Sequence, residues 1–214
     1  MKTSKQFVSF LIAAAMLSFP MLLSSCKEQE DVGEWDNWQT RNEHYLDSIA
    51  SVAKNSSSWT ILKAFNLGDD FGMDKDNKYY VYVQKLENGT GTYKPMYNDS
   101  IRVHYSGRLI PSASYPAGYN FGKSYSTSTL NPETDVPALM GVNQNVIGLA
   151  TAMMNMVEGD RWKIVIPSYI GYGSGDNSTV SIPAGSPLIF DVKLAKIYKY
   201  GIDTDTSWWT KRRK

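Results

Sequence analysis

Apolar and polar residues alternate in part along four segments that are rich in aromatic and β-branched side chains. A period of two is typical of β-strands with one buried face. Residues 146–156 lie among these segments, contain no proline and no internal turn signal, and form the one helix candidate of the region. The pattern predicts an α+β domain of about 120 residues, large enough for its own core. The predicted strands are residues 78–86, 99–109, 161–166 and 187–198.

A helical period runs through residues 35–54, where apolar side chains recur every three or four positions. One face of this predicted helix is apolar and needs a partner. The pattern leaves two options open, which are packing against the same chain and a homodimer through residues 35–54. The apolar positions are Trp35, Trp38, Tyr45, Leu46, Ile49, Val52 and Ala53.

The first 26 residues have the order of a secretory signal with a lipidation site. Lys2 and Lys5 precede an apolar run over residues 7–23, and Leu-Ser-Ser leads to Cys26. This order resembles a bacterial lipoprotein signal. The run contains a proline and is short of the roughly 20 residues that a spanning helix needs. We therefore expect residues 1–25 to be removed and Cys26 to carry a lipid, which anchors the protein in the cell envelope at the periplasmic or surface face of the outer membrane.

Charge and composition exclude several kinds of site. Loss of Lys2 and Lys5 changes the formal net charge from +1 to −1, which gives no electrostatic argument for nucleic acid. Cys26 is the only cysteine, so no internal disulfide is expected. His44 and His104 are the only histidines and have no third ligand placed by spacing. We expect neither metal nor cofactor, and no phosphate-binding or hydrolase motif is present.

Five motifs follow one another in a characteristic order. They are Val103-His104-Tyr105-Ser106-Gly107-Arg108-Leu109, then Phe121, then Val146-Ile147, then Glu158-Gly159-Asp160-Arg161-Trp162-Lys163 with Ile166-Pro167 and Gly171-Tyr172-Gly173, and finally Ile182-Pro183-Ala184 with Leu188-Ile189-Phe190-Asp191-Val192. Together they resemble the FKBP family of peptidyl-prolyl cis-trans isomerases. The resemblance implies a five-stranded, twisted antiparallel sheet wrapped around one short helix over residues 78–199. Residues 26–77 would be a tether and N-terminal helical extension, and residues 200–214 an aromatic and basic tail.

The resemblance also implies an apolar pocket between helix and sheet in which X-Pro bonds of polypeptide clients isomerise. By composition alone most of these side chains would be ordinary core residues, and only the order of the motifs favours a site. The catalytic positions would be Tyr172, Tyr105 and Phe121, and the substrate-binding positions Val146, Ile147, Leu149, Ile182 and Phe190.

Three departures from the family pattern lie around this pocket. Gly122 stands where an aspartate usually follows the phenylalanine, Leu149 replaces a tryptophan at the pocket floor, and residues 110–118 form a longer, proline-containing loop. Such departures suit an isomerase or folding helper for exported proteins with altered specificity. They equally suit a non-catalytic FKBP-like lipoprotein that binds peptides or proteins. A pocket plugged by residues 110–118 would instead indicate a structural role.

Overall fold

The computed structural model describes residues 33–68, 76–175 and 181–202. The predicted signal peptide, the lipidation site Cys26 and the tail beyond residue 202 therefore lie outside the described residues. Among the described helices none is long and apolar enough to cross a membrane.

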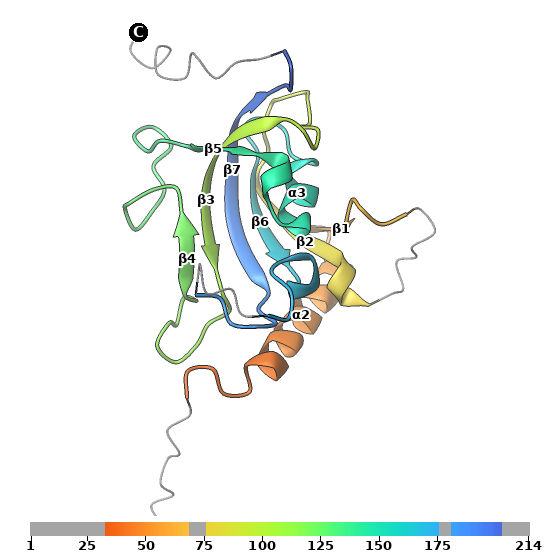
Figure 1. Ribbon diagram of the computed structural model, residues 1–214, viewed down its shortest axis with the longest axis vertical. Coiled ribbons are helices and arrows are strands. Elements are labelled where there is room, and N and C mark those ends of the chain that lie inside the picture. The colour runs from red at the N-terminus through yellow and green to blue at the C-terminus, as the bar shows by residue number, and fades with distance from the viewer. Residues whose placement is uncertain (1–32, 69–75, 176–180, 203–214) are drawn as a thin grey trace, which may run out of the picture. The chain divides into compact units, whose positions relative to one another are not determined.

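One antiparallel sheet of seven strands forms the body of the protein (Figure 1). The strand order is β1-β2-β6-β7-β3-β4, and β5 pairs with the far end of β3. The longest contact is between the two long central strands β3 and β7, which run side by side over nine paired positions. The strands are β1 (Trp59–Lys63), β2 (Tyr80–Glu87), β3 (Ser100–Arg108), β4 (Asn120–Lys123), β5 (Ala138–Gly141), β6 (Arg161–Ile166) and β7 (Leu188–Tyr198).

The fold class predicted from the sequence is confirmed. The four predicted strands correspond to β2, β3, β6 and β7, with ends that agree to within two residues. The sheet has more strands than the five that the resemblance implied, because β1 joins its edge and β4 and β5 are separate short strands. A strand of four residues shows too little alternation to be recognised in a sequence. β1 lies before residue 78, so the expected extension contributes a strand to the same sheet.

Helix α3 (Ile147–Met153) packs against one face of the sheet and is almost wholly buried. It is shorter than the predicted segment 146–156, because the chain after Met153 continues in turns. Gly148 allows the close approach of helix and sheet, since a Cβ built there would lie 2.3 Å from Cγ2 of Ile166. Even an alanine at this position would push α3 away from the sheet.

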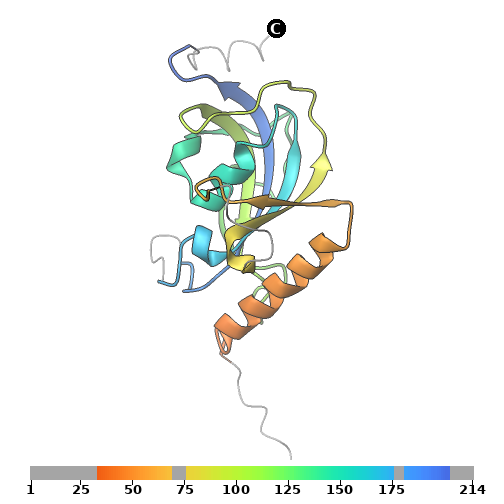
Figure 2. The same cartoon turned by 90° about the vertical axis from the view of Figure 1, so that its right-hand side faces the viewer.

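Helix α2 (Trp38–Lys54) confirms the predicted N-terminal helix, which begins three residues later than expected because Asn37 adopts a left-handed backbone conformation with φ 51°. Ala50 and Ala53 of α2 belong to a buried cluster with Tyr80, Tyr82 and Val165. Successive residues of a strand point to opposite faces of a sheet. Since Val81 and Val83 belong to the cluster around α3, the two helices cover opposite faces of the sheet. In Figure 2, β1 lies between the two helices.

Side-chain hydrogen bonds hold α2 at its first residue and near its middle. The indole Nε1 of Trp38 donates to Oγ of Ser186 at 2.8 Å, and Nδ2 of Asn77 donates to Oδ1 of Asp47 at 2.7 Å. Tyr45, Leu46 and Ile49 of α2 pack against the same buried cluster, whereas Val52 is exposed. Most of the apolar face therefore contacts its own chain, as in the intrachain option.

Candidate active site

A cavity of about 170 Å³ opens between α3, the β3–β4 pair and β7. Six of the eight residues predicted for the pocket line it. They are Tyr105, Phe121, Val146, Leu149, Tyr172 and Phe190. No residue between 110 and 118 contributes to the lining, so the long loop does not plug this cavity.

The other two predicted residues, Ile147 and Ile182, do not line the cavity. The lining residues of the helical segment are Val146, Leu149 and Met153, which are three and four positions apart and share one helix face. Ile147 lies two positions from Leu149 and so faces elsewhere. Ile182 is 2% exposed and packs in the main core. As site assignments both positions remain predictions.

Four further residues line the cavity and were not predicted, namely Met140, Gln144, Asn145 and Met153. Met153 lies four residues after Leu149, so the helical period could have identified it. Met140 reaches the cavity because β5 pairs with β3, and the short β5 carries no recognisable strand pattern. The two amides belong to the turn between β5 and α3. Both amides form hydrogen bonds within this turn. Oε1 of Gln144 accepts from the N–H of Gly141 at 3.0 Å, and Nδ2 of Asn145 donates to the carbonyl oxygen of Gly141 at 2.8 Å.

Two aromatic rings form the wall beside β3. Phe121 and Phe190 come from β4 and β7, the strands that flank β3 in the sheet. Between them, Gly107 of β3 leaves the space for both rings: a Cβ built there would lie 2.5 Å from Cε2 of Phe121 and 2.8 Å from Cε1 of Phe190. The glycine of the Tyr-Ser-Gly motif is therefore required by the shape of the cavity wall.

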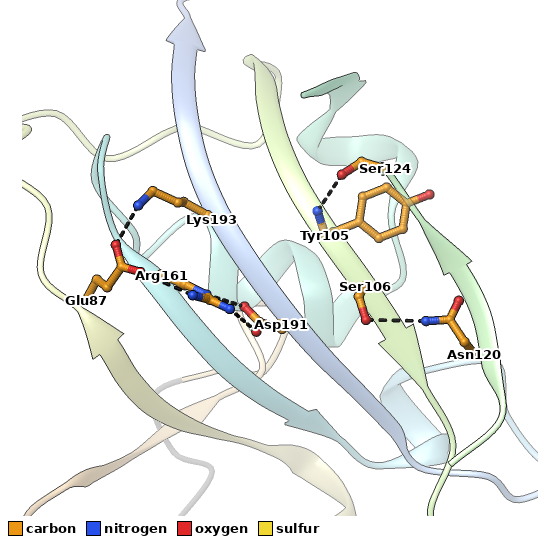
Figure 3. A network of polar contacts seen from close by, with 8 residues as sticks. All are labelled: Glu87, Tyr105, Ser106, Asn120, Ser124, Arg161, Asp191 and Lys193. Carbon is orange, nitrogen blue, oxygen red and sulfur yellow. Dashed lines mark hydrogen bonds and ion pairs between the residues drawn. The ribbon is translucent and has the colours of Figure 1, made fainter. Parts of the chain in front are cut away.

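Tyr105 is held in place by its backbone (Figure 3). Its N–H donates to Oγ of Ser124 at 2.9 Å, and its carbonyl oxygen accepts from the N–H of Ser124 at 3.0 Å. These bonds continue the contact of β3 with the β4 side beyond Lys123, the last residue of β4. The side chain of Tyr105 lines the cavity, and its hydroxyl has no hydrogen-bond partner among the described residues.

Tyr172 provides the second hydroxyl. It follows β6 in a loop between Gly171 and Gly173, and its ring is 39% exposed at the mouth of the cavity. Burial, and to a lesser extent the neighbouring Tyr105, raise the pKa of Tyr172 above its usual 10.0. The phenol is therefore neutral at physiological pH and can donate a hydrogen bond.

The lining of the cavity contains no charged side chain. Gly122, where the resemblance leads one to expect an aspartate, has room for a side chain, since a Cβ built there would lie 3.7 Å from the hydroxyl oxygen of Tyr105. That distance is an ordinary van der Waals contact. The absence of a carboxylate at this position is thus a property of the sequence, and steric constraint does not enforce it.

Ion pairs tie together the strands behind the cavity (Figure 3). Arg161 of β6 donates through Nε and Nη2 to both carboxylate oxygens of Asp191 of β7, at 2.9 and 2.8 Å. Glu87 at the end of β2 accepts from Arg161 and from Lys193. Because Asp191 directly follows Phe190, its side chain points to the opposite sheet face. The network therefore fixes β2, β6 and β7 without entering the cavity.

Within the described part of the chain, no group of three or more histidine, cysteine or acidic side chains is suited to hold a metal ion. The site consists of an apolar wall, a helix face and two phenols. Such an arrangement is suited to binding and orienting a substrate through apolar contacts and two hydroxyls.

Comparison with known proteins identifies relatives of the main domain. Residues 91–195 match the profile of the family described as FKBP-type peptidyl-prolyl cis-trans isomerase. The chain is 32% identical over 114 residues to the macrophage infectivity potentiator of Trypanosoma cruzi, covering 53% of this chain and 51% of that protein. It is 31% identical over 125 residues to the FKBP-type peptidyl-prolyl cis-trans isomerase FkpA of Aeromonas hydrophila, covering 58% of this chain and 40% of that protein.

Solved structures show the same fold. The crystal structure of FkpA from Escherichia coli superimposes with a TM-score of 0.54 at 20% identity, over 92% of this chain and 74% of that one. A peptidyl-prolyl cis-trans isomerase from Pseudomonas syringae gives a TM-score of 0.51 at 23% identity, over 74% of this chain and 95% of that one. The chain spans about half or less of the length of the curated relatives that it matches.

Proposed function

We propose that this protein, whose residues 91–195 belong to the FKBP-type peptidyl-prolyl cis-trans isomerase family, catalyses the cis-trans isomerisation of X-Pro bonds in other polypeptides. Members of this family are enzymes. The observation that carries the proposal is the cavity of about 170 Å³, which combines an apolar wall with two hydroxyls that have no partner among the described residues. We assign the site to the residues that line it.

The chemistry needs no reactive group. Resonance gives the peptide C–N bond double-bond character and a rotation barrier of about 18–20 kcal/mol. For X-Pro bonds both isomers are populated, and they exchange in tens to hundreds of seconds. A twisted amide has lost resonance and carries less charge separation, so an apolar cavity that excludes water favours it over the planar forms. Binding the twisted amide more tightly than either planar isomer lowers the barrier.

The cavity has the size that this mechanism requires. An apolar protein cavity of about 150 Å³ holds a benzene ring, so about 170 Å³ accommodates the five-membered ring of proline. On this proposal, Phe190 and Leu149 contact the ring. Tyr172 at the rim donates its hydroxyl hydrogen to a substrate carbonyl and so sets the direction of the chain. A net hydrogen bond contributes about 0.5–1.5 kcal/mol, which is roughly tenfold or less in rate, so shape and desolvation supply most of the effect.

A second candidate function is a non-catalytic domain that binds proline-containing or apolar segments of a partner. The observation that favours it is Gly122, which leaves the cavity lining without any charged group beside Tyr105. Such a domain would bind peptides in the same cavity and leave their isomerisation rate unchanged.

We further propose that the protein acts on exported polypeptides from a lipid anchor on Cys26 in the bacterial envelope. The support lies in the sequence, where a signal-like run precedes the cysteine and a charged stub over residues 27–31 follows it. Incorporation of labelled palmitate tests the anchor: we expect label in the parent chain and none after Cys26→Ala. Label retained in the variant would contradict it.

The alternative of a homodimer through residues 35–54 has less to support it, because most apolar side chains of α2 already pack on the same chain. Sedimentation velocity at micromolar concentration separates the options. A monomer agrees with the intrachain contact, and a dimer abolished by changes confined to the exposed side of α2 would favour pairing.

The isomerase proposal is tested with Ala-X-Pro-Phe peptides and the unacylated chain carrying Cys26→Ala. We expect faster cis-to-trans exchange for several X residues. Binding of the peptides without any acceleration would favour the second candidate, and neither binding nor acceleration would contradict both.

A further inference from the structure

A second, larger hollow lies between α2 and the loop after β6. This groove has a volume of about 630 Å³, and Glu43, Asp47, Asp76 and Tyr169 are among the residues that line it. We propose that the groove binds a basic segment of the same polypeptide whose proline occupies the cavity. The proposal rests on the proposed function and adds a substrate class to it.

The charges of the groove favour a cation. Three carboxylates line it, and the one lysine in the lining, Lys78, is paired with Asp76 at 2.7 Å. Glu43 and Asp47 are exposed on one side of α2, one helical turn apart. Lining groups therefore carry a net charge of −2, in contrast to the uncharged cavity.

An aromatic ring in the groove offers a surface for a cationic side chain. Tyr169 is 60% exposed, and its ring packs edge to face on Tyr79 with centroids 4.9 Å apart. The Nζ of Lys78 already lies 5.7 Å from the ring centroid of Tyr169. The structure thus contains one cation–aromatic contact at this ring, and a lysine or arginine of a bound chain can make another.

Asn42 supplies the observation that points to a bound polypeptide. It lines the groove and is 3% exposed, yet neither its Oδ1 nor its Nδ2 has a hydrogen-bond partner in the described part of the chain. Buried amides in native proteins are nearly always paired. An amide group has an acceptor and two donors, which match the N–H and C=O of an extended backbone. A side-chain rotation that turns the amide toward a bound strand would satisfy it.

One loop contributes to the linings of both the groove and the cavity. Tyr172 lines the cavity and Gly173 lines the groove, and consecutive Cα atoms are about 3.8 Å apart. A polypeptide that leaves the cavity past Tyr172 therefore reaches the groove within a few residues, at about 3.3–3.6 Å per residue. The basic residue should accordingly stand on one side of the proline, a few positions from it.

Peptide binding tests the proposal. Fluorescein-labelled peptides with an Ala-Leu-Pro-Phe core would carry a four-residue flank with two lysines, two glutamines or two glutamates, before or after the core. Fluorescence anisotropy with the unacylated full chain should show about three- to tenfold tighter binding of the lysine flank than of the glutamate flank, on one side only. Glu43→Gln should reduce this preference, and Glu133→Gln, at an exposed position that lines neither the cavity nor the groove, should not.

Two further variants separate this proposal from the proposed function. Tyr172→Ala should reduce isomerisation and keep the preference for lysine, because the groove is intact. Asn42→Leu should weaken binding of flanked peptides of every charge. A preference for lysine without isomerisation would contradict the isomerase alone. Isomerisation with equal affinity for lysine and glutamate flanks, or a preference unchanged by Glu43→Gln, would overturn the groove proposal.

Discussion

The rings of Phe121 and Phe190 meet edge to face, with centroids 5.4 Å apart and planes at 86°. The two residues come from strands on either side of β3 and meet over Gly107. Edge-to-face pairs contribute about 0.5–1.5 kcal/mol beyond the burial of their area. The wall of the cavity therefore depends on a position that carries no side chain.

Gly107→Ala should damage this wall. The new methyl group would lie 2.5–2.8 Å from both rings, so the rings must separate. We expect a loss of about 1–3 kcal/mol in the free energy of unfolding and a marked fall in peptide kcat/KM. Gly122→Ala is the matched control, because Gly122 pairs with Gly107 across the strands and its Cβ would meet Tyr105 at only 3.7 Å. Equal effects of the two changes would contradict this account.

Tyr172→Phe should lower kcat/KM by roughly tenfold or less, because it removes one hydrogen bond. The pKa of Tyr172 lies above its usual 10.0 owing to burial and to Tyr105, so the protonated donor persists at least to that pH. The activity of the parent should therefore be constant between about pH 6 and pH 9. Stopped-flow measurement of the peptide isomerisation rate over this pH range tests the predicted constancy. A fall in activity well below pH 9 would indicate another titrating group.

Gly122→Asp should place a carboxylate within reach of the Tyr105 hydroxyl. The site has the space for it, and the phenol would then have an acceptor that fixes its ring. Since one hydrogen bond to a charged group contributes about 1.5–3 kcal/mol, we expect kcat/KM to rise by roughly tenfold or more. Gly122→Asn controls for size without charge. Unchanged activity in both variants would show that the geometry of Tyr105 does not limit the rate.

Asp99 joins the loop before β3 to the end of β7. It is 3% exposed and accepts hydrogen bonds from the backbone N–H groups of Met96 and Tyr200 and from the Tyr93 hydroxyl. Burial alone would raise the pKa of Asp99, but these bonds outweigh burial and lower it below 3.8. A lowered pKa means that the ionised form stabilises the fold above about pH 4 and that this contribution is lost as the pH falls further.

Asp99→Asn should therefore lower the free energy of unfolding by about 1.5–3 kcal/mol at pH 7 and by less near pH 3. Urea unfolding at the two pH values measures both. A loss that does not depend on pH would indicate a structural defect unrelated to the charge.

The sequence predicted those parts of the site that follow from periodic patterns and from the order of the motifs. Tyr105 and Phe190 stand on strands with a partial alternation of apolar and polar residues. Ile147 was predicted to line the cavity and does not, because it is the first residue of the short α3 and lies off the helix face that lines the cavity. Met140 could not be predicted, since only the pairing of β5 with β3 brings it to the cavity. The groove beside α2 depends on contacts between distant segments, such as Trp38 with Ser186, which no local pattern reveals.

The most direct test of the central claim, that X-Pro bonds isomerise in the cavity, compares the unacylated chain with its Tyr172→Ala, Phe190→Ala double variant on the same Ala-Leu-Pro-Phe peptide. The account predicts clear acceleration of cis-to-trans exchange by the parent and its loss in the double variant, with unfolding curves that show both proteins folded. Acceleration that survives in the folded double variant, or a parent rate equal to the uncatalysed rate, would contradict it.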